Sequence, residues 1–350
     1  MQMAKFLAKK YYISTIAGAS GISKYSRDFY QLVLEEKGYI FMDSANNLTT
    51  ILSTITSRDH VHIEIGIFQK KEIEILFTML RANYKNVVVT LHDAPLIKYP
   101  YYEFKNTFLN KLSKAADILS NSFGALQPHV KKIKAIYVLS KRGLEAVKRK
   151  YKIDNVYYLP HVVDLVGIKQ GVEGSNNFIY FGFIGRNKGI EYALQLHQRI
   201  VQEHPGIHFY VVGKPIGREA RYYDYLRGKY SKNVHYLGYV PDDQLQGIFD
   251  QATFALQLFK KYKFFWPFSG SILYSLKEGK IILTNKVNTV PEIIENGRNG
   301  FFLSGKIRED LVTVNKIIND RPLLNAMQKE AYQYLEQHHS AEVIKHLLKD

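Results

Sequence analysis

The sequence has no cysteine in 350 residues, and no apolar run reaches the roughly 18 residues that a membrane-spanning helix needs. Without cysteine, the chain has no disulfide, no cysteine-ligated zinc and no thiol nucleophile. The N-terminal segment shows neither a long apolar stretch nor a small-residue cleavage site, so we expect a cytoplasmic location. No H-E-x-x-H pair, Walker loop or Asp-x-Asp motif is present, so we expect no bound metal.

Acidic residues are scarce relative to basic ones, with 32 Asp and Glu against 48 Lys and Arg and a net charge of +16. Residues 98–152 alone hold 13 basic and 3 acidic residues. This stretch predicts attraction to a polyanion or an anionic membrane face, unless it is only a solubilising surface. No zinc finger, RNA-binding signature or basic recognition helix accompanies the charge, so we expect no nucleic-acid partner.

Apolar runs typical of buried strands alternate with helical periods, and the alternation begins again near residue 178. The first series has strands at 9–16, 39–44, 86–93 and 135–140 and helices at 23–38 and 70–84. The second has strands at 178–185, 207–213, 234–240, 252–259 and 280–285 and helices at 190–205, 242–252, 271–279 and 291–297. The pattern predicts an α/β protein with two Rossmann-like, doubly wound parallel-sheet domains. We place these at 1–165 and 166–325, followed by a C-terminal helix at 326–350 that returns to the N-terminal domain.

A glycine-rich turn follows the strand that begins at Phe178, with glycines at 182, 185 and 189. It contains Arg186 and Lys188 and leads directly into a helix. Glycines let a backbone approach a ligand closely, and two cations beside a helix N-terminus favour a diphosphate. The alternative is an ordinary strand-to-helix turn that happens to contain a lysine.

Ser269, Gly270 and Ser271 precede an apolar helical run and predict an N-cap and first turn. Their amides and hydroxyls suit a second anion site, although a plain N-cap explains the same residues. Pro291 and Glu292 predict the start of a further helix.

From about residue 178 to residue 305 the order of these elements resembles the donor-binding domain of retaining GT-B glycosyltransferases. This family includes bacterial mannosyl- and glucosyltransferases of polysaccharide, lipopolysaccharide and glycolipid assembly. The matching pieces are the turn ending in Lys188 and the segments 234–252, 269–284 and 290–302. In the first half, segments 18–36, 87–95, 135–151 and 156–164 are similar to the family's N-terminal domain. The resemblance implies two domains facing a central cleft.

The resemblance also implies roles for individual residues. Lys188 and Arg186 would neutralise the donor diphosphate, and His92 would approach the donor sugar from the other domain. The remaining implied donor contacts are Gly21, Gly182, Tyr239, Val240, Ser269, Gly270, Ser271 and Glu292. Ser20 and Asp93 would contact the acceptor.

The implied reaction transfers a hexose, with retention of configuration, from a UDP- or GDP-linked sugar to a saccharide or lipid-linked acceptor. It needs no cofactor besides this substrate and serves cell-surface polysaccharide or glycolipid assembly. One departure is that Trp266 and Tyr274 stand where many members carry two glutamates. That departure leaves open a non-catalytic GT-B-like partner of another glycosyltransferase.

Aromatic and basic residues alternate at 96–119, immediately after His92 and Asp93. Rings and cations in such a mixture suit the interface of an anionic membrane. We therefore expect a peripheral association with the inner face of the cell membrane. His338 and His339 interrupt the C-terminal helical pattern and are expected to be solvated.

Overall fold

The chain divides into two units, which we describe separately. The computed structural model describes residues 8–16, 20–67, 69–98, 108–109, 112–113, 115–116, 127–166, 175–217, 219–263 and 265–349. The N-terminal unit comprises Met1–Asp164, Lys263–Phe268 and Ala341–Asp350. The C-terminal unit comprises Leu165–Tyr262 and Ser269–Ser340.

The N-terminal unit contains a six-stranded parallel sheet with the order β2-β1-β3-β4-β5-β6. The strands are β1 (Lys10–Ser14), β2 (Tyr39–Asp43), β3 (His60–Ile65), β4 (Val87–Leu91), β5 (Ala135–Val138) and β6 (Val156–Tyr158). The helices are α1 (Gly21–Phe29), which continues into a π-helical turn at Tyr30–Leu34, α2 (Leu48–Thr54), α3 (Lys70–Arg81), α5 (Gln127–Val130), α6 (Lys141–Tyr151) and α13 (Ala341–Leu347).

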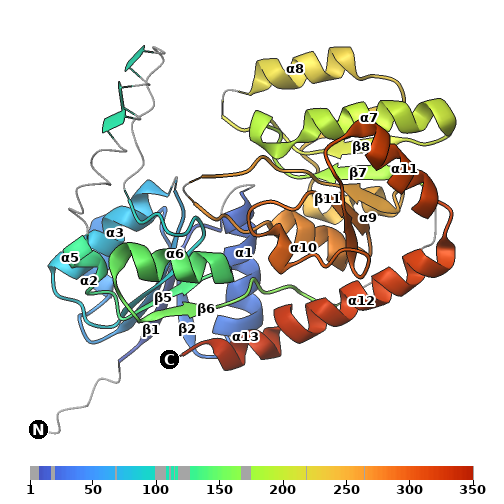
Figure 1. The fold of residues 1–350 in the computed structure, drawn as a ribbon. Helices are drawn as coiled ribbons and strands as arrows, with labels where there is room; N and C mark the ends of the chain where they lie inside the picture. The colour runs from blue at the N-terminus through green and yellow to red at the C-terminus, as the bar shows by residue number, and fades with distance from the viewer. Residues whose placement is uncertain are drawn as a thin grey trace, which may run out of the picture. The chain divides into compact units, whose positions relative to one another are not determined.

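Both faces of this sheet are buried, because successive side chains of a strand point to opposite faces. Tyr11 and Ile13 of β1 pack in one apolar cluster with residues of α2, α3, α5 and α6. Tyr12, between them, packs in a second cluster with residues of α1 and α13. Helices therefore cover the sheet on both sides, as a doubly wound unit requires (Figure 1).

The C-terminal unit contains a second six-stranded parallel sheet, with the order β12-β11-β10-β7-β8-β9. The strands are β7 (Phe178–Phe181), β8 (Phe209–Val212), β9 (Val234–Gly238), β10 (Phe254–Leu256), β11 (Ile281–Thr284) and β12 (Gly300–Phe302). The helices are α7 (Ile190–Glu203), α8 (Ala220–Lys229), α9 (Asp242–Phe249), α10 (Gly270–Lys277), α11 (Ile307–Ile317) and α12 (Arg321–His339). Phe178 and Tyr180 of β7 pack against α7, while Ile179 between them is also fully buried.

Each sheet has a point where the direction of winding reverses. In the N-terminal unit the first strand, β1, lies between β2 and β3, and in the C-terminal unit β7 lies between β8 and β10. The loops on the two sides of such a point leave in opposite directions at the carboxyl ends of the strands. The crevice between them is where open α/β sheets bind ligands.

Several elements depart from the prediction. Helices α2, α5, α8 and α11 and strands β3 and β12 were not predicted. The helix predicted at 291–297 is only a 3-10 turn at Val290–Glu292. There, Asn299 accepts a hydrogen bond from the Glu295 amide at 2.7 Å and donates one to the Ile293 carbonyl at 2.9 Å. These side-chain bonds replace the bonds that a continuing helix would make.

The C-terminal helical pattern is interrupted as predicted, since α12 ends at His339 and α13 begins at Ala341. The expectation that His339 is solvated was wrong, because its side chain is fully buried and its Nε2 lies 3.4 Å from the Tyr334 hydroxyl. In the part of the chain that the structure describes, no helix is long and apolar enough to cross a membrane. Most of the aromatic and basic stretch at 96–119 lies outside the described residues.

Candidate active site

In the C-terminal unit, glycines bring the ends of β7, β8 and α10 together. Gly182 follows β7 with φ +136°, and a Cβ placed on it would lie 3.6 Å from the Cβ of Ser271. A Cβ on Gly213, which follows β8 with φ +146°, would lie 1.8 Å from the Gly182 carbonyl oxygen. No side chain fits at Gly213, and the backbone of the two loops is in direct contact.

The predicted cations lie in a single 3-10 turn, Arg186–Lys188, between β7 and α7. Gly189 ends the turn with φ +62°, and a Cβ there would lie 2.7 Å from the Leu258 carbonyl oxygen. The turn therefore packs against the segment that follows β10. The Lys188 ammonium lies 5.6 Å from the centre of the Phe259 ring, in that same segment.

Arg186 has different neighbours from Lys188. Its Nε lies 3.5 Å from Glu219, and its guanidinium lies 4.3 Å from the centre of the Tyr222 ring. The side chain is 66% exposed, so the ion pair with Glu219 is screened by water and weak. Burial raises the pKa of Tyr222 to about 12, which keeps this ring neutral beneath the cation.

Gln257 connects the glycine-rich turn to the start of α10. This side chain is 1% exposed, and its amide nitrogen lies 3.3 Å from the Phe181 carbonyl, 3.3 Å from the Ser271 carbonyl and 2.9 Å from the Ser275 hydroxyl. Its amide oxygen accepts a hydrogen bond from the Ser271 hydroxyl at 3.0 Å. Gln257 thus fixes the first turn of α10 beside the end of β7.

Ser269 is the N-cap of α10, as predicted from the sequence, but its side chain makes no capping hydrogen bond to the helix. Its hydroxyl instead lies 3.2 Å from the Ser271 hydroxyl. The amides of the first turn therefore keep their hydrogens without a side-chain acceptor from Ser269. Together with the helix dipole, such amides favour an anion.

The other predicted donor contacts follow strands β9 and β11, which are not neighbours in this sheet. Tyr239 follows β9 and is 56% exposed, and the Lys214 ammonium lies 5.8 Å from the centre of its ring. Val240, next in the chain, is half-buried. Glu292 lies in the 3-10 turn after β11, and its carbonyl accepts a hydrogen bond from the Tyr334 hydroxyl at 2.8 Å.

In the N-terminal unit, Ser20 caps α1 and Gly21 is the first residue of that helix. The Ser20 hydroxyl accepts a hydrogen bond from the Ser23 amide at 3.0 Å and lies 2.6 Å from the Ser23 hydroxyl. A Cβ on Gly21 would meet nothing within 4 Å, so Gly21 borders open space. The two residues begin the helix that follows β1, beside the reversal point of this sheet.

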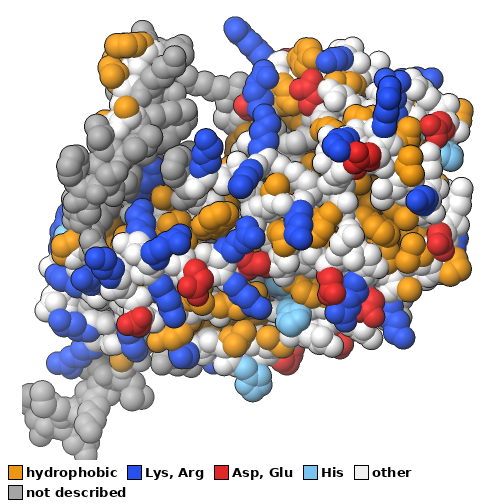
Figure 2. All heavy atoms as spheres, in the orientation of Figure 1, with side chains coloured by type: hydrophobic (Ala, Val, Ile, Leu, Met, Phe, Trp, Pro, Cys, Tyr) orange, Lys and Arg blue, Asp and Glu red, His pale blue; other side chains and the backbone are white. Residues whose placement is uncertain are grey.

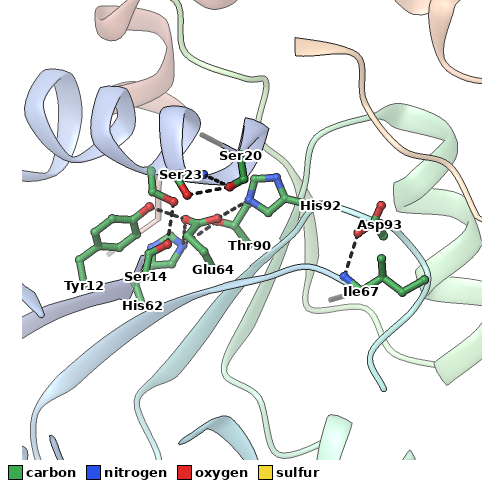
Figure 3. A network of polar contacts seen from close by, with 11 residues as sticks. Tyr12, Ser14, Ser20, Ser23, His62, Glu64, Ile67, Thr90, His92 and Asp93 are labelled. Carbon is green, nitrogen blue, oxygen red and sulfur yellow. Dashed lines mark hydrogen bonds and ion pairs between the residues drawn. The ribbon is translucent and has the colours of Figure 1, made fainter. Parts of the chain in front are cut away.

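His92 follows β4 and belongs to a buried polar network, which Figure 3 shows. Its Nε2 lies 2.7 Å from Oε2 of Glu64, whose other oxygen accepts a hydrogen bond from the Tyr12 hydroxyl at 3.0 Å. His62 lies beside them, with its Nε2 2.7 Å from the Thr90 hydroxyl. Burial lowers the pKa of His62 to about 3, so this imidazole is neutral near pH 7.

Asp93 makes a different kind of contact from its neighbour His92. One of its carboxylate oxygens accepts a hydrogen bond at 2.9 Å from the amide of Ile67, in the turn after β3 (Figure 3). This bond connects the loops that follow β3 and β4. The predicted role of Asp93 in acceptor binding stays a prediction.

The two positions where glutamates were expected are filled by aromatic packing. Trp266 belongs to the N-terminal unit, where its amide donates to the Ala94 carbonyl at 2.7 Å and the Arg142 guanidinium lies 5.7 Å from its ring centre. Tyr274 belongs to the C-terminal unit and packs against Phe181 and Phe249, with ring centres 4.9 and 5.3 Å away.

Sequence reasoning missed Glu64 and Gln257. Each is a polar residue within or just after an apolar strand, and each is almost completely buried. For Gln257 the sequence held a signal, because it stands inside the predicted apolar run 252–259 and a buried polar side chain requires a partner. For Glu64 it held none, because strand β3 was not predicted. Within the described ranges, no group of three His, Asp or Glu side chains is placed to bind a metal ion.

Solved structures share this fold of two parallel-sheet units. Anabaena HepE, in a complex with UDP-glucose, is 14% identical, with 97% of each chain covered and a TM-score of 0.68. Sucrose-phosphate synthase from Thermosynechococcus elongatus is 13% identical, with 96% of each chain covered and a TM-score of 0.70. A mutant of S. aureus TarM, in a complex with Fondaparinux, alpha-GlcNAc-glycerol and UDP, is 13% identical, with 85% of this chain covered and a TM-score of 0.63. The chain spans only 56% of the length of TarM.

Identities this low establish the fold alone, and that fold is GT-B, as predicted. Residues 168–334, nearly the whole C-terminal unit, match the family model of the group 1 glycosyl transferases. This match supports the resemblance drawn from the motifs of the C-terminal half and covers just under half of the chain. Among curated proteins none matches the sequence.

Proposed function

We propose that the chain transfers a hexose from a nucleotide diphosphate sugar to an acceptor hydroxyl with retention of configuration. One observation carries the proposal. At the reversal point between β7 and β10, a glycine-rich turn with two cations lies beside the first turn of α10, whose start has no side-chain cap. Gln257 bridges the two, and this combination suits a diphosphate.

The chemistry follows from where charge develops. The bond between the anomeric carbon and the diphosphate oxygen breaks, the acceptor oxygen bonds to the same face of that carbon, and the acceptor's proton passes to the departing phosphate. In this oxocarbenium-like transition state the departing oxygen gains negative charge. Fixed cations and amides stabilise that charge without rearranging, so Lys188, Arg186 and the amides of Gly270 and Ser271 supply the main catalytic effect.

Among the remaining residues, Tyr239 and Val240 would contact the nucleobase, and Glu292 and Gly182 would line the sugar diphosphate site. His92, Ser20, Gly21 and Asp93 would contact the donor sugar and the acceptor. These assignments rest on their places after the carboxyl ends of strands. UDP is our first choice of nucleotide, because relatives of the same fold were solved with UDP or UDP-glucose.

We further propose a saccharide or lipid-linked acceptor reached at an anionic membrane surface. Helix α6 supports this, since it carries five cations and one acid in eleven residues, and Lys141, Arg142 and Arg149 are exposed. Lys and Arg side chains are frequent over this part of the molecule (Figure 2). Flotation with phosphatidylserine vesicles at low salt tests the proposal. Binding that a Lys148→Glu, Arg149→Glu variant weakens is the expected result, and no flotation of the wild-type protein contradicts it.

The central experiment measures sugar transfer and hydrolysis from UDP- and GDP-sugars in EDTA. We expect activity in the wild-type protein. In Lys188→Ala the rate of transfer should fall about 10²-fold or more, because the negative charge that develops on the departing phosphate loses the Lys188 ammonium. A folded wild-type protein that turns over none of these donors favours the second candidate, a non-catalytic partner of another glycosyltransferase. The packing of Trp266 and Tyr274, at the positions where glutamates were expected, is the observation that keeps this candidate open.

A further inference from the structure

We propose that Glu64 is a positioning residue, which fixes the His92 imidazole with its proton on Nε2 and its Nδ1 presented as an acceptor to a sugar hydroxyl. The inference rests on the proposed function of His92 and adds the residue that orients it. The network in Figure 3 supplies the argument.

Glu64 lies in a position where burying a carboxylate costs free energy, because the side chain is removed from water. It occupies β3 between Ile63 and Ile65, and all three residues have no exposed side-chain surface. A buried carboxylate needs hydrogen-bond donors to compensate for lost hydration. Tyr12 donates to one oxygen at 3.0 Å, and Nε2 of His92 lies 2.7 Å from the other.

His62 cannot take the place of His92 as a hydrogen-bond donor to this carboxylate. Its Nε2 lies 3.7 Å from Glu64, beyond hydrogen-bond distance, and only 2.7 Å from the Thr90 hydroxyl. Burial lowers the pKa of His62 to about 3, so it carries no charge near neutral pH. Among the described residues, the carboxylate therefore relies on Tyr12 and His92 for donated hydrogens.

This arrangement decides the tautomer of His92. A carboxylate only accepts, so Nε2 of His92 must carry the hydrogen, and Nδ1 of the neutral ring then has a lone pair. Nδ1 has no hydrogen-bond partner among the residues that the structure describes, and the side chain is 10% exposed. The ring is also held from the side, in an edge-to-face contact with Tyr25 at 4.9 Å between ring centres.

The backbone places this nitrogen at the carboxyl edge of the sheet. The His92 amide donates to the Ile65 carbonyl at 2.9 Å, which extends the pairing of β3 and β4 by one residue. An acceptor nitrogen fixed at this edge suits a hydroxyl of the hexose or of the acceptor. Without Glu64 the ring could carry its proton on either nitrogen and could rotate, so fewer molecules would present the correct acceptor.

The experiment combines imidazole NMR with kinetics. Long-range ¹⁵N–¹H spectra of the ¹⁵N-histidine-labelled protein distinguish the two tautomers, and loss of one signal in His92→Gln assigns His92. The test variants are Glu64→Leu and the isosteric Glu64→Gln. The matched control is Glu72→Gln, which alters another buried carboxyl of this unit, 4% exposed and 2.6 Å from the Ser44 hydroxyl.

We expect the Nε2–H tautomer in the wild-type protein and in Glu72→Gln, and a mixture in Glu64→Leu. The kcat of sugar transfer should fall about 10-fold in Glu64→Gln and further in Glu64→Leu, while the KM for the nucleotide sugar changes less than about threefold. If Glu64→Leu does not fold, the wild-type spectrum and Glu64→Gln still decide the matter.

Two results would overturn the inference: a wild-type His92 protonated on Nδ1, or Glu64 variants that turn over the donor like the wild-type protein. Either can occur in an enzyme that transfers sugar, so the proposed function would stand. A wild-type protein without any turnover removes the proposed role of His92 toward sugar, even where the spectra show the Nε2–H tautomer.

Discussion

Both units contain a doubly wound parallel sheet, but different chemical groups line the carboxyl edges of the two sheets. In the C-terminal unit the edge consists of backbone and cations, with glycines at 182, 189 and 213 that allow close approach. In the N-terminal unit the edge carries the His92 imidazole, supported by a buried carboxylate. A diphosphate has many equivalent oxygens and suits a broad field of donors, whereas one hydroxyl needs a single fixed acceptor.

The largest effect should come from breaking the backbone contact of the C-terminal edge. In Gly213→Ala the new Cβ would lie 1.8 Å from the Gly182 carbonyl oxygen at a φ of +146°, so the two loops must separate. We expect a loss of more than about 4 kcal/mol in the free energy of unfolding, measured with urea. Gly206→Ala, where nothing lies within 4 Å, is the control and should cost about 1 kcal/mol or less. Equal stability of the two variants would show that the contact is not tight.

A second variant tests how the first turn of α10 is positioned at this edge, without changing any charge. Gln257→Leu removes the bridge between β7 and α10 and leaves the Ser271 and Ser275 hydroxyls without this partner. We expect a loss of about 2 kcal/mol in stability and about 10-fold weaker binding of a nucleotide diphosphate, measured by calorimetry. Gln244→Leu, on the exposed surface of α9, should change neither. Unchanged binding in a destabilised Gln257→Leu would limit its role to folding.

A buried neutral histidine should make each unit sensitive to acid. Burial lowers the pKa of His62 to about 3, whereas an unfolded histidine titrates near 6.5. As pH falls below about 6.5 only the unfolded chain binds this proton, so stability declines toward pH 3. His62→Phe should therefore reduce the stability lost between pH 7 and pH 4.5 in urea unfolding.

His197 is the counterpart in the C-terminal unit, where burial lowers its pKa to about 4. The same sign applies, so His197→Phe should also reduce the stability lost between pH 7 and pH 4.5. No change with either variant would contradict the account of two neutral, buried histidines.

The smallest effect concerns Arg186, which pairs with Glu219 at 3.5 Å on an exposed surface. An exposed ion pair contributes about 0–1 kcal/mol. Glu219→Gln should free the guanidinium to approach a diphosphate, with affinity for UDP or GDP rising about two- to threefold in calorimetry. Weaker binding would instead mean that Glu219 holds Arg186 in its binding position.

The sequence predicted most of the fold because most strands are uninterrupted apolar runs. Val87–Leu91, Phe178–Phe181 and Ile281–Thr284 are of this kind, and all three form buried strands. Strand β3 was not predicted, because His60, His62 and Glu64 alternate with its apolar residues and give the pattern of an exposed segment. Its burial depends on partners from other elements, which no local pattern reveals.

The candidate site also contains a part that the sequence predicted and a part that it could not predict. Glycines and cations next to one another in the chain identified the turn at 182–189 from the sequence alone. Glu64 and His92 are 28 residues apart and meet only because β3 and β4 are neighbours. Gln257 likewise contacts residues up to 76 positions away, so its bridging role could not be predicted before the fold was known.

Binding of a nucleotide diphosphate to the wild-type protein and to Lys188→Ala tests the central claim most directly. Calorimetry with UDP, GDP and ADP should give a dissociation constant in the micromolar range for at least one nucleotide, weakened about 10-fold or more in Lys188→Ala. Lys232→Ala, an exposed lysine away from the carboxyl edge, should bind like the wild-type protein. Binding that Lys188→Ala leaves unchanged, or no binding of any of the three nucleotides, would contradict the account.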